Sequence, residues 1–203
     1  MFKAEKTKNV GIFYVSGKDN FERLITIFNG NLSTKSKQKE FENWLLTFNQ
    51  QYKMDINYKN NLIIPSLSNS WISGFFDALG CFNGRIKNCK KNKFNKVPYL
   101  SFSIKYNEFY IIKLLRDVFL NTQKKNLNNI KYDKSIESWV FHCSDFIKLK
   151  VIRRYLSIHK LRTTSKSLAF RNWCKIHNLV LNKEHLTEDG LNKINLLTKK
   201  LIS

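Results

Sequence analysis

Apolar residues recur along this chain at two spacings, one typical of helices and the other typical of strands. Within residues 37–52 they fall at i, i+3, i+4, i+7 and i+11, which is the spacing of one buried helical stripe. The stripe consists of Phe41, Trp44, Leu45, Phe48 and Tyr52. Within residues 100–105, Leu, Phe and Ile alternate with Ser and Lys, which predicts a strand with one buried and one polar face. The chain therefore combines amphipathic helices with half-buried strands.

The predicted elements fall into two segments that meet around Pro65-Ser66. The first segment, residues 1–66, has few elements: a β-like run at 10–15 and helices near 18–29 and 37–52. The second segment, residues 67–203, is fuller. Its predicted helices lie at 71–80, 108–119, 146–156, 165–180 and 187–201, and its predicted strands at 82–86, 100–105, 130–132 and 138–143. The order of helix, two strands, helix, two strands and helix predicts an α+β fold with an appended C-terminal helix.

The stretch from Trp71 to Phe82 reads W-I-S-G-F-F-D-A-L-G-C-F. It resembles the signature helix of the LAGLIDADG homing endonucleases and maturases, which ends on a carboxylate that holds the catalytic metal. The segment 181–191 resembles the closing segment of that family. The resemblance implies that residues 67–203 form an αββαββα domain with a twisted antiparallel sheet. It also implies that residues 1–66 are the remnant of a preceding repeat, a strand and two helices followed by a linker.

The signature helix departs from the family pattern at the catalytic position, which is Leu79 here. Leucine offers no oxygen to a metal, and Asp77 lies about 200° away around the helix, so it is expected to cap or pair locally. Gly74 and Ala78, one turn apart, keep the small residues that let two such helices pack closely. A homodimer would bring together only two copies of Leu79. We therefore expect no catalytic residue, no metal and no cofactor in this chain.

The formal net charge is +21, from 36 Lys and Arg against 15 Asp and Glu. An excess of this size makes a polyanion the leading expectation for a partner. The four Cys and four His show no zinc spacing, and no apolar run approaches the roughly 20 residues that cross a bilayer. These observations argue against a zinc protein and a membrane protein, and nothing points to a small-molecule substrate.

The family places nucleic acid across the concave face of its sheet, and the matching positions are basic here. The candidate nucleic-acid-binding residues are Arg85, Lys87, Lys90, Lys91, Lys93, Lys96, Lys105, Lys124, Lys125, Lys131, Lys134, Arg153, Arg154, Arg162 and Lys166. The aromatic residues between them, Phe94, Tyr99, Tyr106 and Tyr132, are candidates for stacking on unpaired bases. Lysine outnumbers arginine 29 to 7, which favours contacts to phosphates over bidentate contacts to guanine.

A signature helix without its acid, on a chain rich in lysine, predicts a catalytically inactive RNA-binding protein and not an enzyme. The expected partners are rRNA or structured intron RNA and the other proteins of a ribonucleoprotein. The expected setting is the mitochondrion, as part of its ribosome or as an intron maturase; the A/T-rich codons of Lys and Asn are compatible with an organellar gene. The alternative is a metal-dependent homing DNA endonuclease that becomes active with a partner chain. A third possibility is a decayed intron reading frame.

Overall fold

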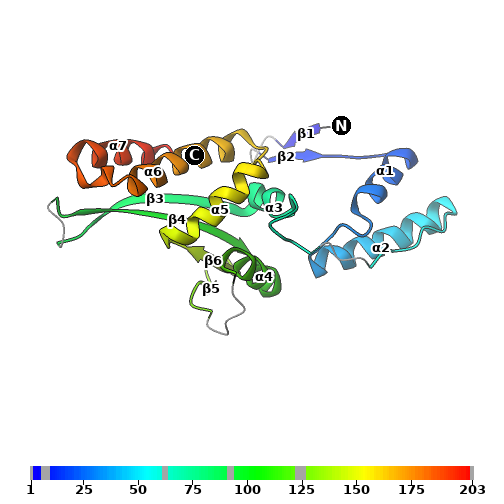
Figure 1. The fold of residues 1–203 in the computed structure, drawn as a ribbon. Coiled ribbons are helices and arrows are strands. Elements are labelled where there is room, and N and C mark those ends of the chain that lie inside the picture. Colours follow the sequence, from blue (N-terminus) through cyan, green and yellow to red (C-terminus); the bar gives the residue numbers. More distant parts are fainter. Residues whose placement is uncertain (1, 6–9, 61–63, 91–93, 122–126, 202–203) are drawn as a thin grey trace. The chain divides into compact units, whose positions relative to one another are not determined.

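The computed structural model describes residues 2–5, 10–60, 64–90, 94–121 and 127–201. The chain divides into two compact units, Met1–Ile64 and Pro65–Ser203, each with its own contacts (Figure 1). Because their mutual placement is not determined, each unit is described by itself. The candidate residues Lys91, Lys93, Lys124 and Lys125 lie outside the described residues.

The first unit consists of a strand hairpin and two helices. Strand β1 (Phe2–Glu5) pairs antiparallel with β2 (Val10–Phe13), and helices α1 (Lys18–Phe28) and α2 (Lys35–Tyr52) follow. The predicted stripe on α2 is confirmed, since Phe41, Leu45 and Phe48 are buried together with Ile25 of α1. Helix α1 ends where predicted, because Gly30 has φ +85°, a backbone conformation that glycine adopts readily.

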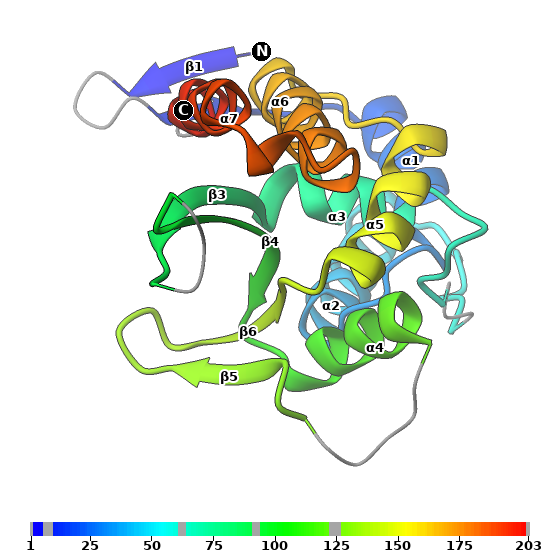
Figure 2. The same cartoon turned by 60° about the vertical axis from the view of Figure 1, so that its left-hand side comes forward.

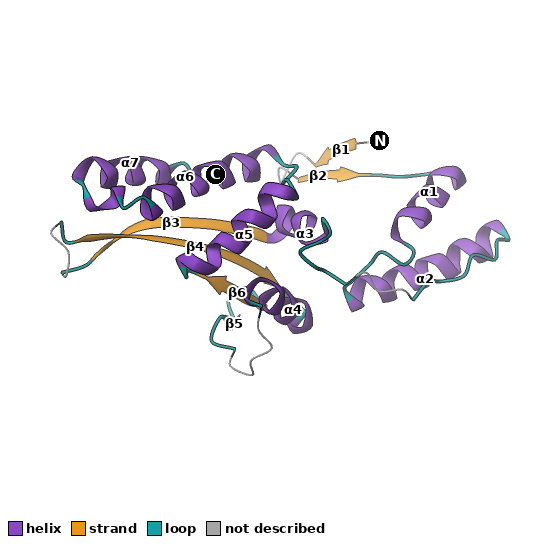
Figure 3. Cartoon of the chain, in the orientation of Figure 1, coloured by secondary structure: helices purple, strands orange, loops and turns teal. Residues whose placement is uncertain are grey.

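The second unit follows the predicted element order, as Figure 3 shows. Its elements are α3 (Trp71–Leu79), β3 (Gly80–Asn88), β4 (Lys96–Tyr106), α4 (Phe109–Leu120), β5 (Ile130–Asp133), β6 (Ser138–Cys143), α5 (Phe146–Ile158), α6 (Thr164–Leu181), a short 3-10 turn (Glu184–Leu186) and α7 (Glu188–Lys199). Every predicted helix and strand of this unit is present. None of the described helices combines the length and apolar character of a membrane-spanning segment.

The four strands form one antiparallel sheet in the order β3-β4-β6-β5. The helices lie along one side of this curved sheet, and its other side is open (Figure 2). Strand alternation sends one set of side chains to each side. On the helix side, Phe82, Leu100, Phe102 and Phe141 are at most 4% exposed and form the core. The predicted alternation of residues 100–105 is therefore confirmed.

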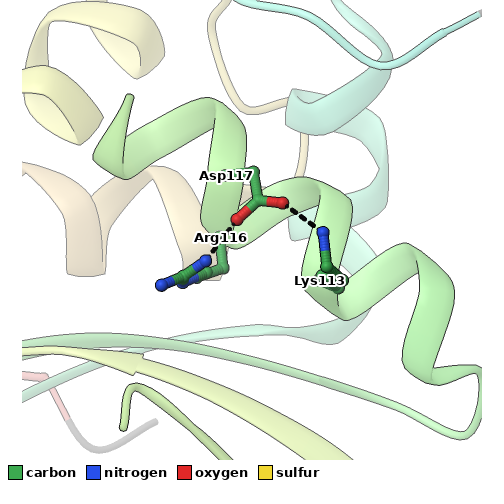
Figure 4. A network of polar contacts seen from close by, with 3 residues as sticks. All are labelled: Lys113, Arg116 and Asp117. Atoms are coloured by element: carbon green, nitrogen blue, oxygen red, sulfur yellow. Dashed lines mark hydrogen bonds and ion pairs between the residues drawn. The ribbon is translucent and has the colours of Figure 1, made fainter. Parts of the chain in front are cut away.

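Helix α4 also buries a cation on the helix side of the sheet. The guanidinium of Arg116 is paired with the carboxylate of Asp117 at 2.5 Å, and Lys113 reaches the same carboxylate at 2.7 Å (Figure 4). Burial alone would raise the pKa of Asp117, but hydrogen bonds and charge from Lys113 and Arg116 hold this pKa below its ordinary value. Arg116 is thus part of the fold and takes no part in the open side of the sheet.

Candidate nucleic-acid interface

The open side of the sheet carries the outward-pointing residues of all four strands. The pairing register places Arg85 opposite Tyr99, and Lys105 and Lys131 on either side of Val140. Strand alternation puts Lys87 on the same side as Arg85. Four candidate cations, Arg85, Lys87, Lys105 and Lys131, therefore share one face, and we call them the open-face cations. None of them has a carboxylate partner among the described ion pairs.

Three further described candidates, Lys90, Lys96 and Lys134, lie at or near the ends of the strands. Lys90 follows β3 and Lys134 lies in the turn between β5 and β6, and both are exposed. Lys96 is the first residue of β4. Strand alternation assigns its side chain to the helix side of the sheet, but the side chain is exposed. These three lysines extend the positive charge past the edges of the open face.

Of the four aromatic candidates, Tyr99 lies on the open face. The ring of Tyr106 packs edge-on against Phe75 of α3 at 5.2 Å. The ring of Tyr132 packs against Trp139 at 5.0 Å, on the helix side of β5. The expectation that Tyr106 and Tyr132 join the binding face is therefore wrong, because their strand positions turn them toward the helices.

Tyr99 organises the centre of the open face. Lys87 Nζ lies 3.4 Å and Arg85 Cζ lies 5.2 Å from its ring centroid. The Tyr99 hydroxyl and His142 Nε2 are hydrogen-bonded at 2.6 Å. Burial lowers the pKa of His142, and the charges of Lys87 and Lys131 lower it further, so the surroundings favour the neutral imidazole. Sequence reasoning did not identify His142, although its place in the alternation of β6 is a usable signal.

The signature helix α3 is held along one side by the segment that joins α5 to α6. At its start, Ser70 Oγ is hydrogen-bonded to His159 Nδ1 at 2.9 Å. One turn later, Ser73 Oγ donates to the Lys160 carbonyl at 3.2 Å. At its end, Lys166 Nζ donates to the Gly80 carbonyl at 2.5 Å. The Lys166 side chain is thereby placed at the C-terminal end of α3.

Asp77 supplies the contact in the middle of this series. Its carboxylate accepts hydrogen bonds from Arg162 N at 2.6 Å, Thr163 N at 3.3 Å and Thr163 Oγ1 at 2.8 Å. Thr163 is the N-cap residue of α6, so Asp77 satisfies amide groups at the start of that helix. Asp77 therefore caps a helix, but the expectation of a local partner is wrong, because the capped helix is α6 and its residues are distant in sequence.

We expect Asp77→Ala to destabilise the protein by about 1–3 kcal/mol, because three donors lose a charged acceptor. Urea unfolding of the purified chain measures the change. Asp77→Asn retains one acceptor oxygen and should lose less. Asp189→Ala serves as a control, since Asp189 forms an exposed pair with Lys193 and should cost under about 0.5 kcal/mol. Equal stability of Asp77→Ala and wild type would contradict the structural role.

The described residues do not fit a metal site at the end of α3. Leu79 has no donor atom, and Asp77 is committed to the start of α6. Within the described ranges, no three His, Cys, Asp or Glu side chains group as a metal site requires. A carboxylate pair for a metal-dependent reaction would therefore have to come from residues other than these.

The fold separates the four remaining candidates, Arg153, Arg154, Arg162 and Lys166. Arg162 and Lys166 lie beside the signature helix. Arg154 is exposed on α5, which packs on the helix side of the sheet. Arg153 donates to Asn178 Oδ1 at 2.5 Å and connects α5 to α6. The structure thus separates Arg153 and Arg154 from the open face.

This chain belongs to the LAGLIDADG endonuclease family, because the sequence model of that family matches residues 72–177, more than half of its length. The matched region runs from the signature helix α3 into α6, so it contains the whole four-stranded sheet.

Two curated relatives and a solved structure are similar to it. A Neurospora crassa protein named "Probable intron-encoded endonuclease 4" is 30% identical over 93% of this chain and 33% of its own length. An "Uncharacterized cox1 intron-2 37.2 kDa protein" of Schizosaccharomyces pombe is 29% identical over 93% of this chain and 55% of its length. This chain therefore spans a third to about half of these relatives. The structure of I-SmaMI bound to an uncleaved DNA target with calcium ions is 25% identical over 66% of this chain and 45% of that one, with a TM-score of 0.59.

These comparisons overturn the predicted function. The relative that is named by activity is an endonuclease, and the solved neighbour was bound to DNA. The predictions of a catalytically inactive protein and of an RNA or ribosomal partner are therefore wrong. Two inferences failed for physical reasons. Leu79 shows that the acid is missing from one repeat, and it does not show that the acid is missing from a whole enzyme. A net charge of +21 attracts the phosphates of DNA as strongly as those of RNA.

Proposed function

We propose that this chain is part of a metal-dependent homing DNA endonuclease and binds duplex DNA across the open face of its sheet. The observation that carries the proposal is that one side of the sheet gathers four cations, Arg85, Lys87, Lys105 and Lys131. The opposite side of the sheet packs against the helices and forms the core. Phosphate contacts supply most of the affinity for DNA, and four unpaired cations on a curved sheet provide them.

The carboxylates for the metal come from a second repeat, on a longer form of the chain or on a partner chain. Gly74 and Ala78 are exposed on α3, and no atom lies within 4 Å of where a Cβ on Gly74 would be. This open strip of small residues suits the close approach of a second signature helix. Residues 1–66 are then the end of a preceding repeat and its linker.

The mitochondrion is the setting that we infer for this enzyme. The Schizosaccharomyces pombe relative carries in its name an intron of cox1, a gene of fungal mitochondrial genomes. An intron-encoded endonuclease acts on DNA of the genome that carries the intron.

The proposal is tested in two stages with the purified full chain. Selection from a randomised duplex library, with unstructured RNA as competitor, should enrich one DNA sequence. That sequence is then placed in a plasmid and incubated with Mg²⁺, the chain and a second LAGLIDADG repeat that carries its acid. Cutting at the selected sequence, abolished by EDTA, supports the proposal. Preference for RNA contradicts DNA binding, and selective binding without cutting in this mixture contradicts the endonuclease.

A further inference from the structure

The open face of the sheet contains a hollow of about 450 Å³. Strand alternation places six of its lining residues on the open side: Cys81, Asn83, Arg85, Tyr99, Ser101 and His142. Ser101 is only 1% exposed, and its hydroxyl oxygen has no hydrogen-bond partner among the described residues. Buried polar groups are normally hydrogen-bonded, because an unpaired one costs free energy. The hollow is therefore suited to a polar group of a ligand.

One ring nitrogen of His142 is available to such a ligand. Its Nε2 is hydrogen-bonded to the Tyr99 hydroxyl at 2.6 Å. Its Nδ1 has no hydrogen bond to a described residue, and it is not among the side-chain atoms that the described structure buries without a partner. The backbone is held in place, since His142 N donates to the Asn129 carbonyl at 2.8 Å and Asn129 Nδ2 donates to the His142 carbonyl at 3.2 Å. The ring is therefore fixed with Nδ1 accessible.

The hydrogen bond between Tyr99 and His142 is compatible with both charge states of the ring, because a phenol hydroxyl can donate and accept. In a neutral ring that accepts the Tyr99 hydroxyl proton at Nε2, the ring proton is on Nδ1. When the ring takes a proton from solvent, Nε2–H donates to the Tyr99 oxygen instead, and Nδ1 keeps its proton. His142 can therefore gain a charge without moving, and Nδ1–H is a donor in either state.

The surroundings of His142 on this face are basic. The charged and titratable side chains of the neighbouring strands are Cys81, Arg85 and Lys87 on β3, Tyr99 and Lys105 on β4, and Lys131 and Asp133 on β5. The Asp133 carboxylate accepts hydrogen bonds from Ser135 in the turn that follows. Burial lowers the pKa of His142, and Lys87 and Lys131 lower it further. The protein alone thus opposes a charge on His142.

Bound DNA removes part of that opposition. A phosphate among the open-face cations offsets the charges of Lys87 and Lys131, and a phosphate oxygen is an acceptor for Nδ1–H. We propose that His142 is a further DNA contact of the open face, donating from Nδ1 to a phosphate oxygen in this hollow, and that it takes up a proton when the DNA binds. The inference rests on the proposed function and adds to it a dependence of DNA affinity on pH.

The direction of this dependence follows from linkage. A group whose pKa is higher in the complex than in the free protein binds a proton on association, so the affinity rises as the pH falls between the two pKa values. Each pKa unit of difference corresponds to at most a tenfold change in affinity. We therefore expect wild-type affinity for a mixed-sequence duplex to rise about 3- to 10-fold from about pH 7.5 to about pH 5.5 at constant salt, the range in which histidine titrates.

Two substitutions of the full chain give this test its controls. His142→Gln keeps a side-chain N–H donor but cannot titrate, and it should lose most of the rise. His185→Gln makes the same change in the turn between α6 and α7 and should keep the wild-type pH dependence. Equal pH dependence in wild type and His142→Gln would overturn the inference. A rise confined to one DNA sequence would indicate a contact to a base and would also overturn it.

Nuclear magnetic resonance of the histidine rings supplies a second measurement that needs no substitution. The pKa of His142, followed through its ring carbon shifts, should increase by about 0.5 to 1 unit or more when the duplex is added, while the pKa of His185 stays constant. An unchanged pKa of His142 in a chain that binds DNA would refute the proton uptake and leave the proposed function intact. Failure of the wild-type chain to bind duplex DNA at either pH would refute both.

Discussion

Gly80→Ala is expected to destabilise the second unit by about 3 kcal/mol or more. A Cβ at this position would overlap the ring of Phe76. That ring cannot move aside, because it is fully buried and stacks on Phe102 at 4.6 Å and against Phe82 at 4.7 Å. Urea unfolding measures the loss, and it should be accompanied by weaker aromatic circular dichroism.

Gly74→Ala is the matched control, since it adds the same methyl group within α3, the helix that ends just before Gly80. Nothing lies within 4 Å of the added Cβ, and alanine favours a helix over glycine by up to about 1 kcal/mol. We therefore expect Gly74→Ala to be neutral or stabilising in this chain. If the two variants lost similar stability, the packing around Gly80 would not be the cause of its effect.

The same control also tests the proposed assembly. If a second signature helix packs against the strip of Gly74 and Ala78, a methyl group on Gly74 obstructs that approach. Gly74→Ala should then lower Mg²⁺-dependent cutting in the mixture with a second repeat, while the isolated chain keeps or gains stability. A substitution that lowers cutting in the mixture while the isolated chain keeps or gains stability acts on an interface and not on the fold.

The element order of the second unit could be predicted from sequence because its strands alternate and its helices have single apolar stripes. The sequence also predicted that α3 ends at Gly80, but the reason for a glycine there is visible only in the structure. Gly80 has φ −81°, an ordinary extended conformation, so the space taken by Phe76 and not backbone freedom requires glycine here. Phe76 is held in this space by stacking on Phe102 of β4, and a contact between residues so far apart in sequence leaves no local pattern.

In the candidate site, too, some features follow from the local sequence pattern and others depend on contacts between residues distant in sequence. Alternation alone assigns Arg85, Lys87, Lys105 and Lys131 to one face, but it cannot show that Tyr99 gathers two of them. The role of Asp77 depends on Thr163, 86 residues away in sequence.

Removal of all four open-face cations, Arg85, Lys87, Lys105 and Lys131, to alanine is expected to weaken duplex DNA binding on the order of 100-fold or more at low salt. Each phosphate contact contributes about 0.9 to the slope of log affinity against log salt concentration. The slope should therefore fall in magnitude by about 3 to 4 if all four side chains contact phosphate. Binding isotherms at several salt concentrations measure both quantities.

The control removes four exposed helix lysines, Lys148, Lys150, Lys175 and Lys199, and so changes the net charge by the same amount. These side chains are carried by α5, α6 and α7, which pack on the other side of the sheet. Loss of long-range attraction alone would weaken both quadruple variants equally. A larger loss and a smaller salt slope for the open-face variant locate the phosphate contacts on the open face. If the helix-side variant lost as much affinity, the open face would not be the binding surface.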